Sequence, residues 1–206
     1  MVGLRLAVAL AVVLIGALAC GKEASPAGWE TTFDTDEGWN LSSDPVANVA
    51  VADGVLQVHI ISPGQIAWAA SNATWQDCVV SVKATQISGP ADNEYGILLR
   101  MDGEGGFTAF SISGDGYARV ARYEDGVWSV LGSDWTPTGA INEGVATNRL
   151  EVLARDTQLE FRVNDELVSQ IEDPEVRQGP IGLYAGAFSE GDVVVAFDDL
   201  IVEPAP

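Results

Sequence analysis

Aromatic and basic residues alternate along one segment, Tyr117-Ala-Arg-Val-Ala-Arg-Tyr123, in a pattern that suits recognition of a flat, hydroxylated ligand. Successive side chains of a strand point to opposite faces, so Tyr117, Arg119 and Tyr123 are expected on one side. Aromatic rings can stack on the C–H face of a sugar, and a guanidinium can donate to its hydroxyl groups. The same row could instead be a cross-strand aromatic ladder that only stabilises a sheet. The spacing therefore predicts a ligand platform or a structural ladder.

Other tryptophans extend this prediction. Trp128 and Trp135 flank a loop that follows the segment, and we expect them at the rim of the same face. Trp39 and Trp68 are expected in the hydrophobic core. Trp128 is therefore a further candidate ligand-binding residue.

The acidic residues do not suggest catalysis. A retaining glycosidase needs two carboxyl groups roughly 5 Å apart, which on one strand means acids at alternate positions. We expect no strand with such a pair, because the acids gather in turns such as Asp102-Gly-Glu104 and Glu124-Asp125. This distribution favours binding over hydrolysis.

Acids near the two chain ends suggest a structural Ca²⁺ site. Asp198 and Asp199 lie on the last expected strand, which we expect to approach Asp34 just after the first strand. Calcium prefers several oxygen ligands from loops. No EF-hand spacing is present. His59 is the single histidine, so zinc and a Ser–His triad have little support.

The N-terminus has the parts of an export signal: Arg5, an apolar stretch from Leu6 to Leu18, and small Ala19. The apolar stretch is shorter than the roughly 20 residues that span a bilayer. Cys20-Gly21 follows, and the whole resembles the lipobox of bacterial lipoproteins. The resemblance implies that Cys20 is diacylated and becomes the first residue. The alternative is an ordinary secreted protein in which Cys20 is only a nearby thiol.

This organisation divides the chain into a signal peptide (1–19), a lipidated flexible tether (20–28) and one β-sandwich domain (29–206). Cys78 is then the only unmodified thiol, so no intramolecular disulfide is expected. Cys78, Val80 and Val82 share one apolar side, which predicts that Cys78 lies in the core.

The formal net charge of −20 at pH 7 limits the kinds of molecule that the protein can bind. Such a charge repels nucleic acid and anionic lipid head groups, so no nucleic-acid partner is expected. Cations and neutral ligands remain possible.

From Ala47 onward, short β-branched and aromatic runs alternate with turns that combine Gly with Asp or Asn, the pattern of antiparallel hairpins. No helical period is sustained beyond the signal, so the chain is expected to be all-β. The expected strands are Glu30–Phe33, Asn48–Ala52, Val55–Ile61, Gln65–Ala70, Asp77–Gln86, Tyr95–Met101, Phe107–Ser113, Tyr117–Tyr123, Val127–Leu131, Arg149–Ala154, Leu159–Val163, Glu166–Ile171, Ile181–Ala187 and Val193–Val202.

So many strands bury their apolar faces best as two packed antiparallel sheets. We expect a jelly-roll sandwich in which the first and last strands are neighbours.

Motifs along the whole domain carry a second resemblance. Gly38-Trp39, Tyr95-Gly-Ile-Leu-Leu-Arg100, Asp125-Gly-Val-Trp128 and Phe197-Asp198 occur in an order that looks like the concanavalin A-like lectin/glucanase superfamily. Within it the chain is most similar to the laminin-G-like and 3-keto-disaccharide hydrolase type domains of bacterial lipoproteins. The Glu-x-Asp-x-x-Glu signature of laminarinase-type members is absent.

One segment, Asn93 to Arg100, resembles the Asn-x-Gly-Ile-Phe-Leu-Arg stretch of the 3-keto-disaccharide hydrolase type domains. The resemblance implies that Arg100 points from a strand end into a concave face and binds sugar oxygens. The alternative is that Arg100 neutralises nearby acids such as Asp102.

Taken together, the sequence predicts an exported protein, lipid-anchored to a bacterial membrane or cell surface, whose domain binds a glycan or another surface polymer without catalysis. One alternative is a structural or protein-interaction envelope lipoprotein. Another is a glycoside or keto-disaccharide hydrolase.

Overall fold

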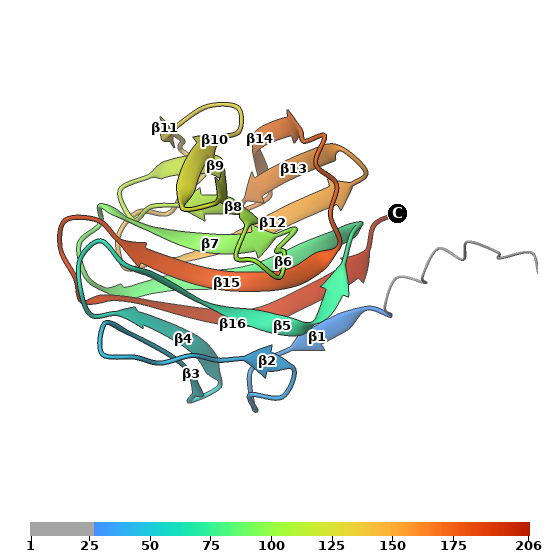
Figure 1. The fold of residues 1–206 in the computed structure, drawn as a ribbon. Coiled ribbons are helices and arrows are strands. Elements are labelled where there is room, and N and C mark those ends of the chain that lie inside the picture. The colour runs from blue at the N-terminus through green and yellow to red at the C-terminus, as the bar shows by residue number, and fades with distance from the viewer. Residues whose placement is uncertain (1–26) are drawn as a thin grey trace, which may run out of the picture.

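A computed structural model describes residues 27–206, which form strands and loops without a helix (Figure 1). The strands are β1 Trp29–Thr31, β2 Trp39–Asn40, β3 Ala47–Ala52, β4 Val55–Ile60, β5 Ile66–Trp75, β6 Cys78–Ser88, β7 Asn93–Leu99, β8 Phe107–Ile112, β9 Tyr117–Glu124, β10 Val127–Val130, β11 Thr136–Pro137, β12 Thr147–Arg155, β13 Gln158–Val163, β14 Glu166–Glu172, β15 Gly179–Ala187 and β16 Val193–Pro204. The predicted all-β class is confirmed for this part of the chain.

The strands form two antiparallel sheets of eight strands each. Sheet A has the order β14-β13-β12-β6-β16-β4-β3, with β1 paired to β16. Sheet B has the order β10-β9-β8-β7-β15-β5-β2, with β11 paired to β9. In Figure 1, β5 and β15 of sheet B lie in front of β16 and β6 of sheet A. The predicted jelly-roll sandwich is confirmed.

Tight turns set the register of the hairpins. Asp53-Gly54, Asp125-Gly126 and Asn164-Asp165 each place two consecutive residues at positive φ. Two such residues match the twist of the flanking strands in a two-residue hairpin. The Asp125-Gly126 turn joins β9 to β10 and so fixes which of their side chains share a face.

The first and last strands pair as expected, with Trp29 opposite Val202. Trp29 also stacks on Trp75 of β5, with ring centroids 5.8 Å apart. Strand β5 extends to Trp75, past its expected end, and β7 begins at Asn93, before its expected start. Because β7 starts early, Glu94 belongs to sheet B, where it contacts Arg119.

The main core lies between the sheets and includes Cys78, as predicted. Cys78 is 1 % exposed, and burial, together with the charge of Asp77, raises its pKa to about 12. A thiol held neutral in this way is a packing group. Phe110 of sheet B meets Phe161 of sheet A across this core, with ring centroids 5.0 Å apart.

The predicted signal peptide, Cys20 and most of the tether lie outside the described residues. In residues 27–206 no helix is long and apolar enough to cross a bilayer.

Candidate ligand-binding face

The outer face of sheet B, which points away from the core, carries a row of polar and aromatic side chains. The register of β5, β15, β7, β8 and β9 places five residues side by side across it. They are Trp68, Tyr184, Gly96, Ser111 and Arg119.

Beside this row runs a row of mostly small residues: Ala70, Gly182, Leu98, Ala109 and Ala121. Beyond it, Phe107, Tyr123 and Trp128 follow one another across β8, β9 and β10. The small side chains leave room for the larger rings to lean over the sheet.

The leaning rings form a connected layer, here called the aromatic platform: Trp68, Phe107, Tyr123 and Trp128. Phe107 is buried at its centre and contacts the other three, with ring centroids 5.3 to 5.7 Å away. Tyr123 and Trp128 lie 5.1 Å apart. Trp68, Tyr123 and Trp128 stay half-buried, so their rings form the solvent-facing surface of a small second cluster.

A buried polar network lies next to the platform. Glu94 Oε2 accepts hydrogen bonds from Arg119 Nη2 at 3.0 Å and from the Tyr184 hydroxyl at 3.3 Å. The Tyr184 hydroxyl also hydrogen-bonds with Ser111 Oγ. The site holds Glu94 because Gly186 opposite it has no side chain: a Cβ there would lie 2.8 Å from Glu94 Cγ.

Burial sets the titration behaviour of this network. Burial raises the pKa of Glu94, and the charge of Arg119 offsets only part of that effect. Burial, together with the nearby charge of Glu94, raises the pKa of Tyr184 well above its ordinary value. Tyr184 is therefore a neutral hydrogen-bonding group.

Arg119 is held between two indoles. Its guanidinium carbon lies 5.0 Å from the ring centroid of Trp128 and 4.7 Å from that of Trp135. A cation over an indole face is attracted by the ring quadrupole, and the Glu94 carboxylate fixes its orientation. The guanidinium is thus positioned by the protein before any ligand binds.

A pocket lies at one end of this face, where β8 and β9 turn. Its cavity volume is about 520 Å³. The residues that line it include no basic side chain and are Asp92, Ser113, Asp115, Tyr117, Trp135 and Phe188. The Trp135 ring meets Phe188 edge-on, with centroids 5.9 Å apart. The pocket therefore combines aromatic walls with two carboxylates.

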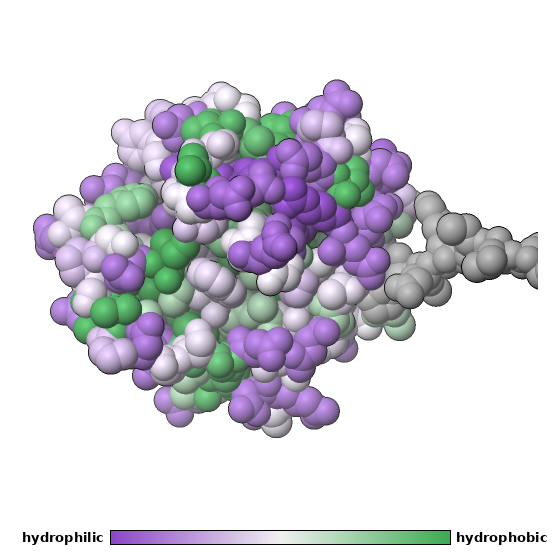
Figure 2. Space-filling view, viewed as in Figure 1, coloured by the Kyte–Doolittle hydropathy of each residue, from purple (hydrophilic) through white to green (hydrophobic). Residues whose placement is uncertain are grey.

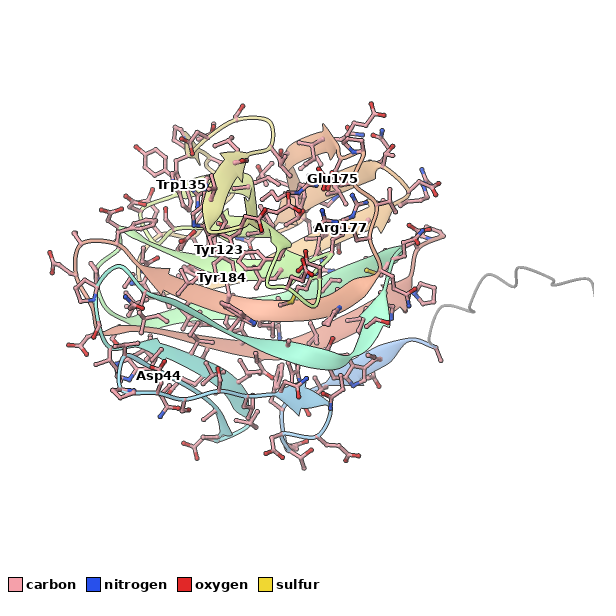
Figure 3. All side chains as sticks on the ribbon, viewed as in Figure 1. Asp44, Tyr123, Trp135, Glu175, Arg177 and Tyr184 are labelled. Atoms are coloured by element: carbon pink, nitrogen blue, oxygen red, sulfur yellow. The ribbon has the colours of Figure 1, made fainter. Side chains whose placement is uncertain are left out.

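The opposite end of the face carries an ionic cluster around Arg177. Its guanidinium lies 3.0 Å from Asp102, 2.7 Å from Glu124 and 2.6 Å from Glu175. In Figure 3, the labels of Tyr123 and Tyr184 lie between those of Arg177 and Trp135. Figure 2 shows hydrophilic residues gathered where the cluster lies. The platform is thus bordered by charged side chains at one end and by the pocket at the other.

The hollow of about 550 Å³ lies on the outer face of sheet A. Its two basic residues are already paired, Lys83 with Asp199 and Arg149 with Glu151. No aromatic ring lines it. It offers no stacking surface, so the face of sheet B is the better candidate despite the smaller cavity.

The structure brings together most of the ligand-binding residues predicted from the sequence. Tyr117, Arg119, Tyr123 and Trp128 all lie on the outer face of sheet B. Tyr123 stands in a cross-strand ladder with Phe107 and Trp128, whereas Tyr117 lines the pocket. The ladder and the exposed platform are therefore parts of one arrangement.

Two expectations need correction. Trp68 belongs to the platform and not to the core between the sheets. Arg100 does not point onto the outer face of sheet B: its guanidinium is buried against Asp173, at 2.8 Å, and donates to the carbonyl of Asp156 at 2.5 Å. Arg100 has a φ of 54°, and this left-handed conformation ends the alternation of β7 and redirects the side chain.

The three predicted calcium ligands are not gathered. Asp199 pairs with Lys83 at 2.5 Å, Asp34 accepts a hydrogen bond from Thr32, and Asp198 accepts one from the Asp199 backbone. A register shift interrupts the pairing of β16 with β6 directly after Asp198. Among residues 27–206 no group of three His, Cys, Asp or Glu side chains is arranged to hold a metal ion.

Glu94 was missed by the sequence reasoning. The expected strand began at Tyr95, which left Asp92 and Glu94 in a loop, although they alternate directly before an apolar run. This alternation indicates that the strand starts earlier, which places Asp92 and Glu94 together at the N-terminal end of β7.

Comparisons with known proteins agree with this architecture. No family model and no curated protein matches the chain. The carbohydrate-binding module CBM66 from Bacillus subtilis is 18% identical, with a TM-score of 0.65 over 81% of this chain and 95% of that chain. A prokaryotic β-1,3-1,4-glucanase (lichenase) from a mouse hindgut metagenome is 12% identical, with a TM-score of 0.64 over 86% and 99%.

A third solved structure, a Bacillus subtilis protein of unknown function with a galectin-like fold, is 11% identical, with a TM-score of 0.64 over 88% of this chain and 97% of that chain. The fold is a concanavalin A-like jelly roll. At these identities the likeness establishes the fold alone.

Proposed function

We propose that this protein is a glycan-binding surface lipoprotein, and that the outer face of sheet B binds the glycan. The observation that carries the proposal is the aromatic platform beside the Glu94–Arg119 pair. Half-buried rings would stack on the C–H faces of sugars, and the fixed guanidinium would donate to hydroxyl groups.

Preorganisation supports the same proposal. Arg119 is held by Glu94, Trp128 and Trp135, so little side-chain freedom would be lost when a ligand binds. Among the proteins of similar fold are a carbohydrate-binding module and a transglycosylase whose structure is described as a complex with NAG. These names are consistent with a glycan ligand on this fold.

Glycan binding is tested with the soluble form that begins at Trp29, on a glycan array with and without calcium. For any glycan that binds, Trp128→Ala should weaken binding at least tenfold, because stacked aromatic side chains dominate such contacts. Val145→Ala is the control, since Val145 is apolar and 73% exposed but lies outside the platform. Absence of binding to every glycan would contradict the proposal.

The lipid anchor is the second part of the proposal, and it rests on Leu14 to Gly21. Several acyl chains on Cys20 would hold the domain on a membrane. Mass spectrometry should find a modified Cys20 at the mature N-terminus, and Cys20→Ala should release the protein from the membrane fraction. A mature protein that begins elsewhere, with Cys20 unmodified or removed, would show simple secretion.

A second candidate function is glycan hydrolysis, and the position of Glu94 favours it. Burial raises the pKa of Glu94, as is typical of a general acid, and Asp92 lies two residues away. Release of reducing ends from a bound glycan, abolished by Glu94→Gln, would support hydrolysis. Binding without release supports the non-catalytic function.

A further inference from the structure

We propose that the pocket formed by Asp92, Ser113, Asp115, Tyr117, Trp135 and Phe188 binds the protonated amino group of an amino sugar. This inference rests on the proposed function, because the platform would hold the neighbouring units of the same glycan. The inference assigns a ligand class, a cationic glycan, to the outer face of sheet B.

The lining of the pocket fits a cation. Tyr117, Trp135 and Phe188 supply aromatic surface, and Asp92 and Asp115 supply carboxylates, while no Lys or Arg side chain lines the cavity. Aromatic faces attract an ammonium group, and carboxylates accept its hydrogen bonds. A neutral sugar would use only the aromatic part of this surface.

Local hydrogen bonds hold the Asp115 carboxylate and connect its turn to the backbone beside Asp92. The Ser113 hydroxyl donates to Asp115 Oδ1, and the Gly114 backbone N–H donates to Asn93 Oδ1 at 3.3 Å. The second bond ties the start of β7, next to Asp92, to the turn that carries Asp115. The two acids therefore border one cavity although they come from different elements.

The charges around the pocket reinforce this preference. Glu143 lies against the same turn, since a Cβ on Gly116 would be 2.9 Å from Glu143 Oε1. Arg119, which stacks on Trp135, already forms an ion pair with Glu94 at 3.0 Å. The positive charge next to the pocket is thus neutralised, and the remaining field is negative.

The pocket also lies in line with the platform. Tyr123 of the platform and Tyr117 of the pocket mark the two ends of one side of β9. At about 3.3 Å per residue they are roughly 20 Å apart, a span that a short oligosaccharide can cover. One amino sugar of such a chain would enter the pocket while other units stack on the platform.

The test compares two oligosaccharides of equal length, one of glucosamine and one of N-acetylglucosamine, which differ in the charge of the nitrogen. Binding to the full-length protein in detergent micelles is measured by calorimetry. We expect glucosamine oligomers to bind about tenfold more tightly, equivalent to about 1.4 kcal/mol. The double variant Asp92→Asn/Asp115→Asn should lose this preference.

A matched control separates the pocket from the overall negative charge. Glu104→Gln/Asp125→Asn also removes two carboxylates, from exposed turns at the opposite ends of β8 and β9, and should keep the preference. If the pocket variant keeps the preference, or if both double variants lose it equally, the amine site is overturned.

Two further outcomes distinguish this inference from the proposed function. Equal binding of both oligomers by the unmodified protein, or binding only of other glycans, would overturn the amine site and leave the platform intact. Absence of binding to every glycan would overturn both.

Discussion

The outer faces of the two sheets are built differently, although both belong to the same sandwich. On sheet A, the ion pair of Lys83 with Asp199 lies in solvent, with side chains 52% and 42% exposed. On sheet B, the pair of Arg119 with Glu94 is 13% and 5% exposed and lies beside a layer of aromatic rings.

This difference shows how a solvent-facing side of a sheet can become a second apolar layer. Sheet A mostly follows the usual alternation of apolar side chains inside and polar side chains outside, although Leu153 and Val79 pair on its outer side. On sheet B the side chains of Ala109 and Ala121 are small, which leaves room for the Phe107 ring on the outer face, where it is buried. The polar groups that remain there must satisfy one another, as Glu94 and Arg119 do.

The strongest test of this contrast is Phe107→Ala. Phe107 is 1% exposed at the centre of the platform, so its loss should lower the free energy of unfolding by about 3–5 kcal/mol. Leu153→Ala, at a half-buried position on the outer side of sheet A, should cost distinctly less. Urea denaturation measures both, and equal costs would contradict the idea of a second apolar cluster.

The next largest effect is expected for Glu94→Ala. The substitution leaves the Arg119 guanidinium largely buried without its acidic partner, so the free energy of unfolding should fall by about 3 kcal/mol. Glu94→Gln keeps an acceptor for Arg119 and should lose less. If both variants match the unmodified protein in urea denaturation, the buried pair does not stabilise this face.

A pH dependence should distinguish Glu94 from the exposed acids. Burial raises its pKa above the ordinary value of 4.5, so the folded state binds this proton more tightly than the unfolded state does. Its contribution to stability is therefore fullest below pH 4.5 and declines as pH rises through the folded-state pKa. Glu94→Gln should lack this decline in urea denaturation at several pH values, whereas an identical pH profile would contradict the raised pKa.

The smallest effect is expected on sheet A. Glu151→Ala removes one of two acidic partners of the partly exposed Arg149 and should change the free energy of unfolding by less than about 1 kcal/mol. The same measurement at high salt should show an even smaller change, because salt screens exposed pairs. A loss as large as that of Glu94→Ala would remove the contrast between the two faces.

Local patterns in the sequence were enough to predict most of the strands, although not the short β2 and β11, and which side chains of β9 share a face. Turns such as Asp53-Gly54 define hairpins through backbone conformation alone, and strict alternation places Tyr117, Arg119 and Tyr123 on one side of β9. The apolar side shared by Cys78, Val80 and Val82 likewise located part of the core. These features depend on neighbours within a few residues, so the sequence by itself determined them.

Contacts between distant strands were decided only by the tertiary structure. Glu94 reaches Arg119 because β8 lies between β7 and β9 in the sheet, and Trp68 joins the platform because the register of β5 faces it outward. Arg100 turns toward Asp173 because its positive φ ends the alternation that would otherwise have placed it on the outer face of sheet B. Strand order, register and a single dihedral angle are properties of the packed sandwich, and local alternation in the sequence does not specify them.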